Sequence, residues 1–232
     1  MTPRNVIDEV RVLLNDTRSP YRYSMEDLLR FYNDVARRML VLRPDIFAVG
    51  LSFGVNVNNY VQGDAPLSNN YYAILDFDSS RNFITGERAA MEEVPYEEFT
   101  RAKRLWINDD LGLPTKFARD PNLRTRVYVN PPPSSGVFLD GVFAYFPKLL
   151  TESMLDETMN AEDRHVIPQY APALVDGIVF LAQSIDDEHI SSGRAQLFYQ
   201  SFINALGTAE QVVERRVGPL PDELRGEGND AR

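Results

Sequence analysis

The sequence predicts an α+β protein in which two helix pairs, one at each end of the chain, form a four-helix bundle that carries an inserted antiparallel β domain and a flexible C-terminal tail. Apolar residues recur with helical spacing in both terminal regions and alternate with polar residues in the middle of the chain. The 232 residues suffice for one domain or two small ones. The predicted segments are residues 1–46 (helix pair), 47–167 (β domain with a short helix and an acidic connection), 168–217 (helix pair) and 218–232 (tail).

Two helices are predicted at the N-terminal end. Pro3 suits the first turn of the first helix. Ser24 and Asp27 form a capping signal for the second helix, which ends before Pro44. Each helix carries one apolar stripe at the spacing of a helix face. The stripes are Val6, Ile7, Val10, Leu13 and Leu14 in the first helix, and Leu28, Leu29, Tyr32, Val35, Ala36, Met39 and Leu40 in the second.

The middle of the chain is predicted to be a β module. Alternation and turn residues predict its strands, and the connections are too short for repeated crossover helices, which favours antiparallel pairing. Pro95 suits the first turn of a short helix. The predicted elements are strands at 48–58, 72–77 and 83–85, the last two joined by a turn at 78–82, then the helix at 95–107 and strands at 115–119, 124–130 and 137–146.

Two further helices are predicted after the acidic connection at residues 147–167. The short turn at Ser191, Ser192 and Gly193 predicts that they pack antiparallel. The tail has few large apolar residues and is expected to be disordered in isolation. The helix stripes are Tyr170, Ala171, Leu174, Ile178, Leu181, Ala182 and Ile185, then Phe198, Tyr199, Phe202, Leu206, Ala209 and Val213.

The composition excludes several functional classes. The chain has no cysteine, so disulfides, thiolate metal sites and cysteine nucleophiles are excluded. The formal net charge is −10 and the pI is about 4.8, which argues against a basic DNA-gripping surface. The first residues lack the apolar stretch of a secretory signal, so a soluble protein made in the cytoplasm is expected.

One motif suggests hydrolase chemistry. The segment from Gly50 to Gly54 matches G-x-S-x-G, with Ser52 as the candidate nucleophile and His165 and His189 downstream. A nucleophile elbow needs a strand, a sharp turn and then a helix. Here the alternation continues through residues 55–58, so Ser52 is expected to lie within a strand or hairpin.

A second motif suggests calcium binding. Oxygen-bearing side chains from Asp76 to Glu87 match positions of a calcium loop, but Arg81 stands where such a loop needs glycine. A hairpin turn is the favoured interpretation. No glycine-rich phosphate loop and no histidine cluster is present, so no cofactor or metal is predicted. The acidic connection is interpreted as a solvated charge run.

The order of segments along the chain gives a resemblance to a known family. From residue 6 to residue 207 the chain resembles the head-to-tail adaptor (connector) proteins of tailed bacteriophages. The segments that carry the resemblance are the opening helix ending at Asp16 and Thr17, then residues 22–24 with 28–34, residues 42–45, the segment Arg126 to Pro132, residues 170–176 and residues 198–207.

The resemblance implies a structural virion protein without enzymatic activity, made in the host cytoplasm. Such adaptors form a ring, typically of twelve copies, that joins the portal to the tail or nozzle protein in the neck of the virion. Double-stranded DNA passes through the ring without sequence-specific binding, and no membrane is involved. Twelve copies would carry twelve times −10, or −120 formal charges, and a lumen of that sign would repel phosphates.

The resemblance also implies which segments meet which partners. By position, residues 207–232 face the portal and the β module at 47–146 faces the tail. Arg215 and Arg216 suit the C-terminal end of the last helix, and equally a pairing with portal acids. The candidate portal contacts are Arg215, Arg216, Pro219, Leu220, Pro221 and Leu224.

Three alternatives to the adaptor remain. The chain could be another neck or tail-completion protein of a phage. It could also be a serine hydrolase that uses Ser52, or a calcium-binding module centred on Asp76.

Overall fold

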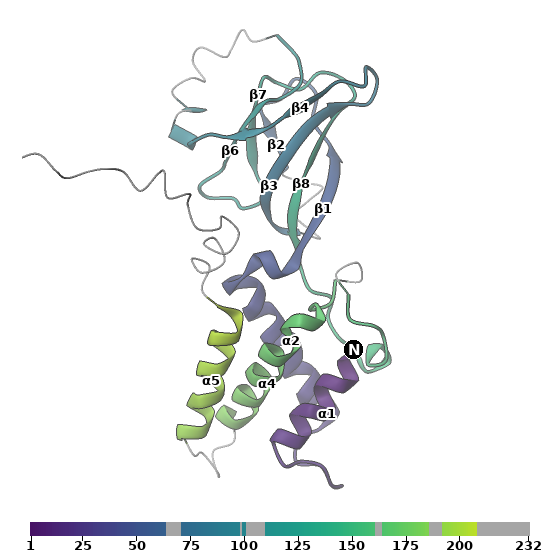
Figure 1. Ribbon diagram of the computed structural model, residues 1–232, viewed down its shortest axis with the longest axis vertical. Coiled ribbons are helices and arrows are strands. Elements are labelled where there is room, and N and C mark those ends of the chain that lie inside the picture. The colour runs from purple at the N-terminus through teal and green to yellow at the C-terminus, as the bar shows by residue number, and fades with distance from the viewer. Residues whose placement is uncertain (64–70, 98, 101–109, 161–163, 186–191, 208–232) are drawn as a thin grey trace, which may run out of the picture. The chain divides into compact units, whose positions relative to one another are not determined.

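The protein divides into two compact units. The computed structural model describes residues 1–63, 71–97, 99–100, 110–160, 164–185 and 192–207 (Figure 1). One unit, called here the helical unit, contains Arg4–Val35 and the chain from Gln169 onward. The other, called the sandwich unit, contains Met1–Pro3 and Ala36–Pro168.

All four predicted terminal helices are present. They are α1 (Pro3–Leu13), α2 (Met25–Leu42), α4 (Ala171–Ile185) and α5 (Ser192–Leu206). The capping signal at the start of α2 is confirmed, because Asp27 N donates to Ser24 Oγ at 3.0 Å and Ser24 Oγ donates to Asp27 Oδ2 at 2.7 Å. The hydrogen bond from Ser24 lowers the pKa of Asp27. This cap therefore fixes where the helix begins.

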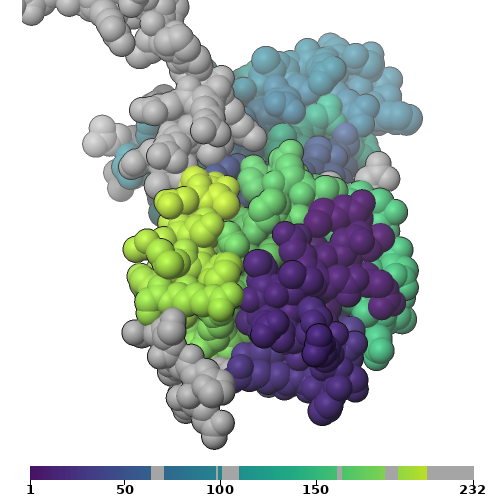
Figure 2. Space-filling model, turned by 60° about the horizontal axis from the view of Figure 1, so that its bottom comes forward, coloured from purple at the N-terminus to yellow at the C-terminus, as the bar shows by residue number. Residues whose placement is uncertain are grey.

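The prediction that these helices form a four-helix bundle is wrong. A bundle helix buries one apolar stripe against its neighbours. On α4, however, buried residues cover about two-thirds of the circumference at 100° per residue. Of the α5 side chains that the structure describes, only Ala195, Phe202 and Leu206 are buried, and most of the helix lies at the surface (Figure 2). In addition, α2 belongs to the helical unit only up to Val35.

The sandwich unit contains two four-stranded sheets. The first sheet has the order β1-β8-β3-β4 and the second β2-β7-β6-β5. Both central pairings, β1 with β8 and β8 with β3, are antiparallel. The strands are β1 (Ala48–Gly54), β2 (Val61–Gln62), β3 (Tyr71–Asn82), β4 (Arg88–Ala90), β5 (Glu92–Glu93), β6 (Lys116–Arg119), β7 (Val127–Asn130) and β8 (Val137–Tyr145).

The two sheets share one aromatic core. Phe77 of β3 lies near its centre, in edge-to-face contact with Phe117 of β6 at 5.1 Å and Phe143 of β8 at 5.8 Å between ring centroids. Aromatic pairs of this geometry add to the stabilisation that area burial provides. The buried cluster consists of Ile74, Phe77, Phe117, Val127, Val129, Leu139 and Phe143, which come from both sheets. The module is therefore a β-sandwich.

The structure corrects several details of the predicted β module. The turn predicted at 78–82 is wrong, because β3 continues through these residues to Asn82 and the chain reverses at 83–87. One pairing, β5 with β6, is parallel. The first strand ends at Gly54, earlier than predicted. Of the helix predicted at 95–107, residues 96, 97, 99 and 100 are helical, and residues 101–109 lie outside the described residues.

Short 3-10 helices connect the larger elements. Pro44–Phe47 (η1) lies between α2 and β1, and Glu152–Met154 (η2) and Pro168–Tyr170 (η3) lie between β8 and α4. Before β1, Arg43 is buried and its guanidinium pairs with Asp45 through two hydrogen bonds, at 2.8 and 2.7 Å. Within the described ranges, every helix is too short or too polar to span a membrane.

Candidate interaction surfaces of the sandwich unit

Ser52 lies in the middle of β1, within a polar cluster on the outer face of the first sheet. Its hydroxyl donates to the Asp140 carboxylate of β8 and accepts a hydrogen bond from Arg81 Nη2 at 3.0 Å. Residues 55–60, which follow β1, contain no helix. The strand–turn–helix geometry that a nucleophile elbow requires is therefore absent at Ser52.

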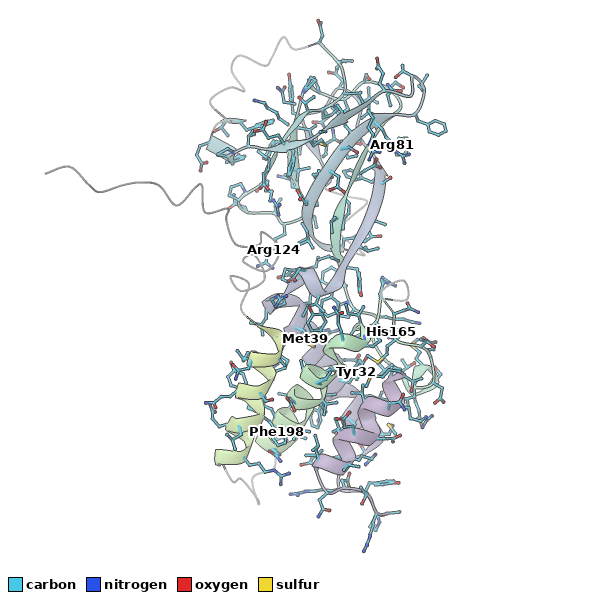
Figure 3. The ribbon with its side chains drawn as sticks, in the orientation of Figure 1. Tyr32, Met39, Arg81, Arg124, His165 and Phe198 are labelled. Atoms are coloured by element: carbon cyan, nitrogen blue, oxygen red, sulfur yellow. The ribbon has the colours of Figure 1, made fainter. Side chains whose placement is uncertain are left out.

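Asp140 is the centre of this polar cluster. It accepts a hydrogen bond from Ser79 Oγ at 3.3 Å, and its oxygens lie 3.3 Å from Arg81 Nε and 3.8 Å from Arg88 Nη2. Arg88 Nε also donates to Ser79 Oγ at 3.0 Å. Figure 3 shows Arg81 on the sandwich unit. A shallow pocket of about 330 Å³ lies here, lined by Gly50, Leu51, Ser52, Asp78, Arg81, Arg88, Asp140 and Gly141.

The contacts of this cluster form a network of ion pairs and hydrogen bonds around Asp140. Two guanidiniums surround one carboxylate, and the serine hydroxyl donates to an acid that already has three other partners. A nucleophilic serine instead needs a base that can take its proton, usually a histidine. The guanidinium groups of Arg81 and Arg88 suit hydrogen-bond acceptors such as carboxylates.

The β3–β4 hairpin ends in an ordered apolar tip, formed by Phe83 and Ile84. Their side chains are 80% and 71% exposed. Asn82 fixes the turn, because its Oδ1 accepts from Ile84 N at 2.8 Å and from Thr85 N at 3.1 Å. Gly136, at φ +78°, packs against the tip, where a Cβ would come within 2.7 Å of Ile84 Cδ1. Phe83 and Ile84, predicted as strand residues, are thus turn residues.

The hairpin also occupies the segment that matched a calcium loop. Asp76, Asp78 and Asn82 lie on β3, and Glu87 follows the turn. Among the described residues, no three or more acidic or histidine side chains gather in a way that could hold a metal ion.

His165 lies in the connection after β8, where it is buried (Figure 3). Its Nε2 lies 3.2 Å from Glu157 Oε2, which also accepts a hydrogen bond from Lys148 Nζ at 3.2 Å. The hydrogen bonds from Lys148 and then His165 lower the pKa of Glu157. The Tyr145 hydroxyl donates to the backbone oxygen of His165 at 2.9 Å, and burial raises the pKa of Tyr145 to about 12.

The partners of His165 therefore come from its own connection and from β8, and its contacts hold this segment in place. The second histidine of the hydrolase hypothesis, His189, lies outside the described residues, as do Glu162 and Asp163 of the acidic connection. Of the two histidines, the structure describes only His165, and its ring nitrogen contacts Glu157 rather than Ser52.

The residues predicted to contact the portal also fall outside the described part of the chain. Residues 208–232 include the whole of that set: Arg215, Arg216, Pro219, Leu220, Pro221 and Leu224. Conversely, sequence reasoning missed the polar cluster around Asp140 and the exposed hairpin tip of Phe83 and Ile84. The alternation of β8 could have placed Asp140 on the outer face, but only the strand register joins it to Ser52 and Arg81.

Comparison with known proteins identifies a family. The model of the family described as SU10 adaptor protein matches residues 1–223. A search of curated proteins finds no match.

Proposed function

The chain belongs to the SU10 adaptor protein family of phage head-to-tail adaptors, and from this membership we propose that it forms a ring between the portal and the tail. As a phage adaptor it is a structural component of the virion that interacts with other virion proteins. The proposed ring, of twelve copies, lies in the neck and prolongs the DNA channel. In this role the protein has no catalytic activity.

The observation that carries the proposal is the extent of the family match. Residues 1–223 include all described helices and both sheets, so the likeness covers both units rather than one common element. The geometry at Ser52 agrees with a non-catalytic role, because its hydroxyl contacts an arginine-paired carboxylate, Asp140, and Arg81 rather than a histidine.

The division into two units suggests a division of partners. We assign the helical unit, with the segment from residue 207 to 232, to the portal side, and the sandwich unit to the tail side. A segment of low apolar content can order on a partner surface, and many such segments in one ring offset the ordering cost together. The net charge of −10 suits a conduit for DNA, because an acidic lumen does not hold phosphates.

Electron microscopy of the purified protein mixed with its portal tests the proposal. We expect a ring stacked coaxially on the portal. If the two never associate and crosslinking in the particle joins the chain to tail proteins alone, the portal assignment is wrong and a tail-completion role replaces it.

Paired variants test the portal-facing segment. Replacing Arg215 and Arg216 with glutamate, or deleting residues 218–232, should weaken portal attachment and leave the thermal midpoint nearly unchanged. The matched control is glutamate at Arg37 and Arg38, a second adjacent pair, which is exposed on α2. If the control variant loses attachment equally, the effect comes from net charge and the assignment of the segment fails.

A further inference from the structure

The strand β1 is an edge of the first sheet, and its outer side pairs with no strand among the described residues. It pairs with β8 along its whole length, from Ala48↔Ala144 to Gly54↔Phe138, and it is the terminal strand in the order β1-β8-β3-β4. It is seven residues long and has neither a charged residue nor a proline. Natural proteins normally protect edge strands with charged residues, with prolines or by keeping the strand short, because an open edge can pair with another chain.

The register shows which backbone groups of β1 point outward. Val55 N donates to Val137 O, which marks a hydrogen-bonded pair of the β1–β8 ladder. Because such pairs alternate along an antiparallel ladder, Phe53, Leu51 and Val49 also bond to β8. The N–H and C=O groups of Gly50, Ser52 and Gly54 therefore face away from β8, and none of them bonds to the backbone of any residue that the structure describes.

The opposite edge of the same sheet is covered. Arg119 donates to the backbone oxygens of Ile74 and Leu75 on β3, and Ile74 N donates to Arg124 O at 2.9 Å. Further along, β4 pairs with β3, and Met91 N donates to Asp78 O at 3.2 Å. In the second sheet the edge strands β2 and β5 have only two residues each, and β5 consists of two glutamates.

We propose that β1 accepts an extended segment of another virion protein as an added strand of the sheet. Strand addition needs an open row of backbone donors and acceptors, which β1 supplies at every second residue. The three residues of β1 whose backbone groups point to the open edge are two glycines and a serine, so their side chains add little bulk beside an incoming backbone. Apart from Gly50 and its two chain neighbours, no atom of the described residues lies within 4 Å of the position that a Cβ on Gly50 would occupy.

The polar cluster defines the chemistry of the added strand. Arg81 reaches from β3 across β8 to Ser52, so its guanidinium lies beside the open edge. Asp140 already has four partners, about as many as a carboxylate accepts, whereas each guanidinium has donors that these contacts leave unused. Asp78 lines the same pocket without an ion pair to either arginine among the described residues. The added strand therefore carries a carboxylate opposite Ser52.

A second copy of the chain fits this edge less well. Antiparallel pairing of β1 with β1 around Ser52 would bring two Arg81 guanidiniums together, and like charges directly opposite each other destabilise a sheet. The occupant is thus a different protein with an acidic residue in an extended segment. That this protein belongs to the virion rests on the proposed function. The open edge of β1 and the arginines beside it are described independently of that proposed function.

Residue-resolved amide exchange tests strand addition, because amides that bond to β8 alternate along β1 with amides that face the open edge. In the free protein, the amides of Leu51 and Phe53 should exchange slowly, and those of Gly50, Ser52 and Gly54 rapidly. In the adaptor within intact particles, the amides of Gly50, Ser52 and Gly54 should slow by on the order of tenfold or more. Fast exchange at these three residues in the particle overturns the proposal. Slow exchange in concentrated free protein, with a doubled mass, overturns it as well, because the occupant is then a second copy.

A pair of lysine variants separates this proposal from the proposed function. Gly50→Lys places a charge on the open edge, and Ala90→Lys places the same charge on the exposed end of β4. We expect Gly50→Lys to reduce tail-bearing particles by on the order of tenfold, and Ala90→Lys to have little effect. Both variants should still stack on the portal. Failure of the unmodified protein to stack refutes the proposed function alone, whereas equal particle yields from the two variants refute strand addition alone.

Discussion

The helices α4 and α5 have the same length and pack against each other, yet their environments differ sharply. Buried residues cover most of the surface of α4, among them Ile178 and Gly177, whereas α5 buries little beyond Phe202 and Leu206. The difference shows that the helical unit is organised around one central helix. Side chains of α4 should therefore contribute more to the free energy of unfolding than side chains of α5, most of which lie at the surface.

The largest expected effect comes from a cavity in α4. Ile178 is fully buried, so Ile178→Ala should lower the free energy of unfolding by about 2–5 kcal/mol, through lost apolar burial and the cavity left behind. Urea denaturation followed by far-UV circular dichroism measures this loss. A loss below about 1 kcal/mol would show that α4 is not the centre of the unit.

A methyl group added to α4 should also destabilise the protein, although it favours the helix. Gly177→Ala gains up to about 1 kcal/mol in helix propensity. The new Cβ would, however, come within 2.6 Å of Val35 Cγ1 and 3.1 Å of Phe202 Cδ2, and overpacking typically costs about 1–3 kcal/mol. We expect a lower thermal midpoint in calorimetry. A higher midpoint would mean that the contact between α4 and its neighbours is loose.

A smaller effect is expected at the polar contact between the two helices. Ser201 Oγ donates to Asp176 Oδ2 at 2.6 Å, and both residues are accessible to water. Ser201→Ala should cost about 0.5–1 kcal/mol in urea denaturation. The control is Ser184→Ala, which removes a hydrogen bond to Phe180 O within α4 itself. Equal losses in the two variants would contradict a contribution from the interhelical bond.

The smallest effect is expected on the outer side of α5. Leu197 is 66% exposed, so Leu197→Ser should change the free energy of unfolding by no more than about 0.5 kcal/mol. Urea denaturation of this variant beside Ile178→Ala gives the contrast directly. Comparable losses in the two would remove the distinction between the helices.

The sequence predicted the elements well because their signals are local. The cap at Ser24, the proline that begins α1 and the apolar stripe through Ile178 all depend on residues within a few turns. The bundle was predicted wrongly because a stripe identifies one buried face and says nothing of the others. Val175 and Val179 lie outside the predicted stripe and are buried as well, whereas Ile185, within it, is 60% exposed.

The turn at 78–82 was mislocated for a related reason. Ser79 and Ser80 are typical turn residues, but here they are buried strand residues whose hydroxyls bond to Asp140 and to Pro114 O. These partners are 61 and 34 residues away along the chain.

The polar cluster around Ser52 also depends on residues that are distant along the chain. The motif around Ser52 identified a strand that takes part in a polar cluster, but the nucleophilic chemistry it suggested is not supported by the contacts of Ser52. Its actual partners, Asp140 and Arg81, are 88 and 29 residues distant. Only the register of β1, β8 and β3 brings the three together, and no local pattern encodes that register.

The division of β1 into inward and outward residues has a consequence for mutational screens. Leu51 and Phe53 pack against the aromatic core, so changes there would be detected in any melting experiment. Gly50 is exposed and makes no side-chain contact, so substitutions at it would pass such a screen unnoticed. A library sorted by heat resistance alone would accept many different residues at Gly50, whereas plaque counts on a bacterial lawn would reveal which residues the phage tolerates.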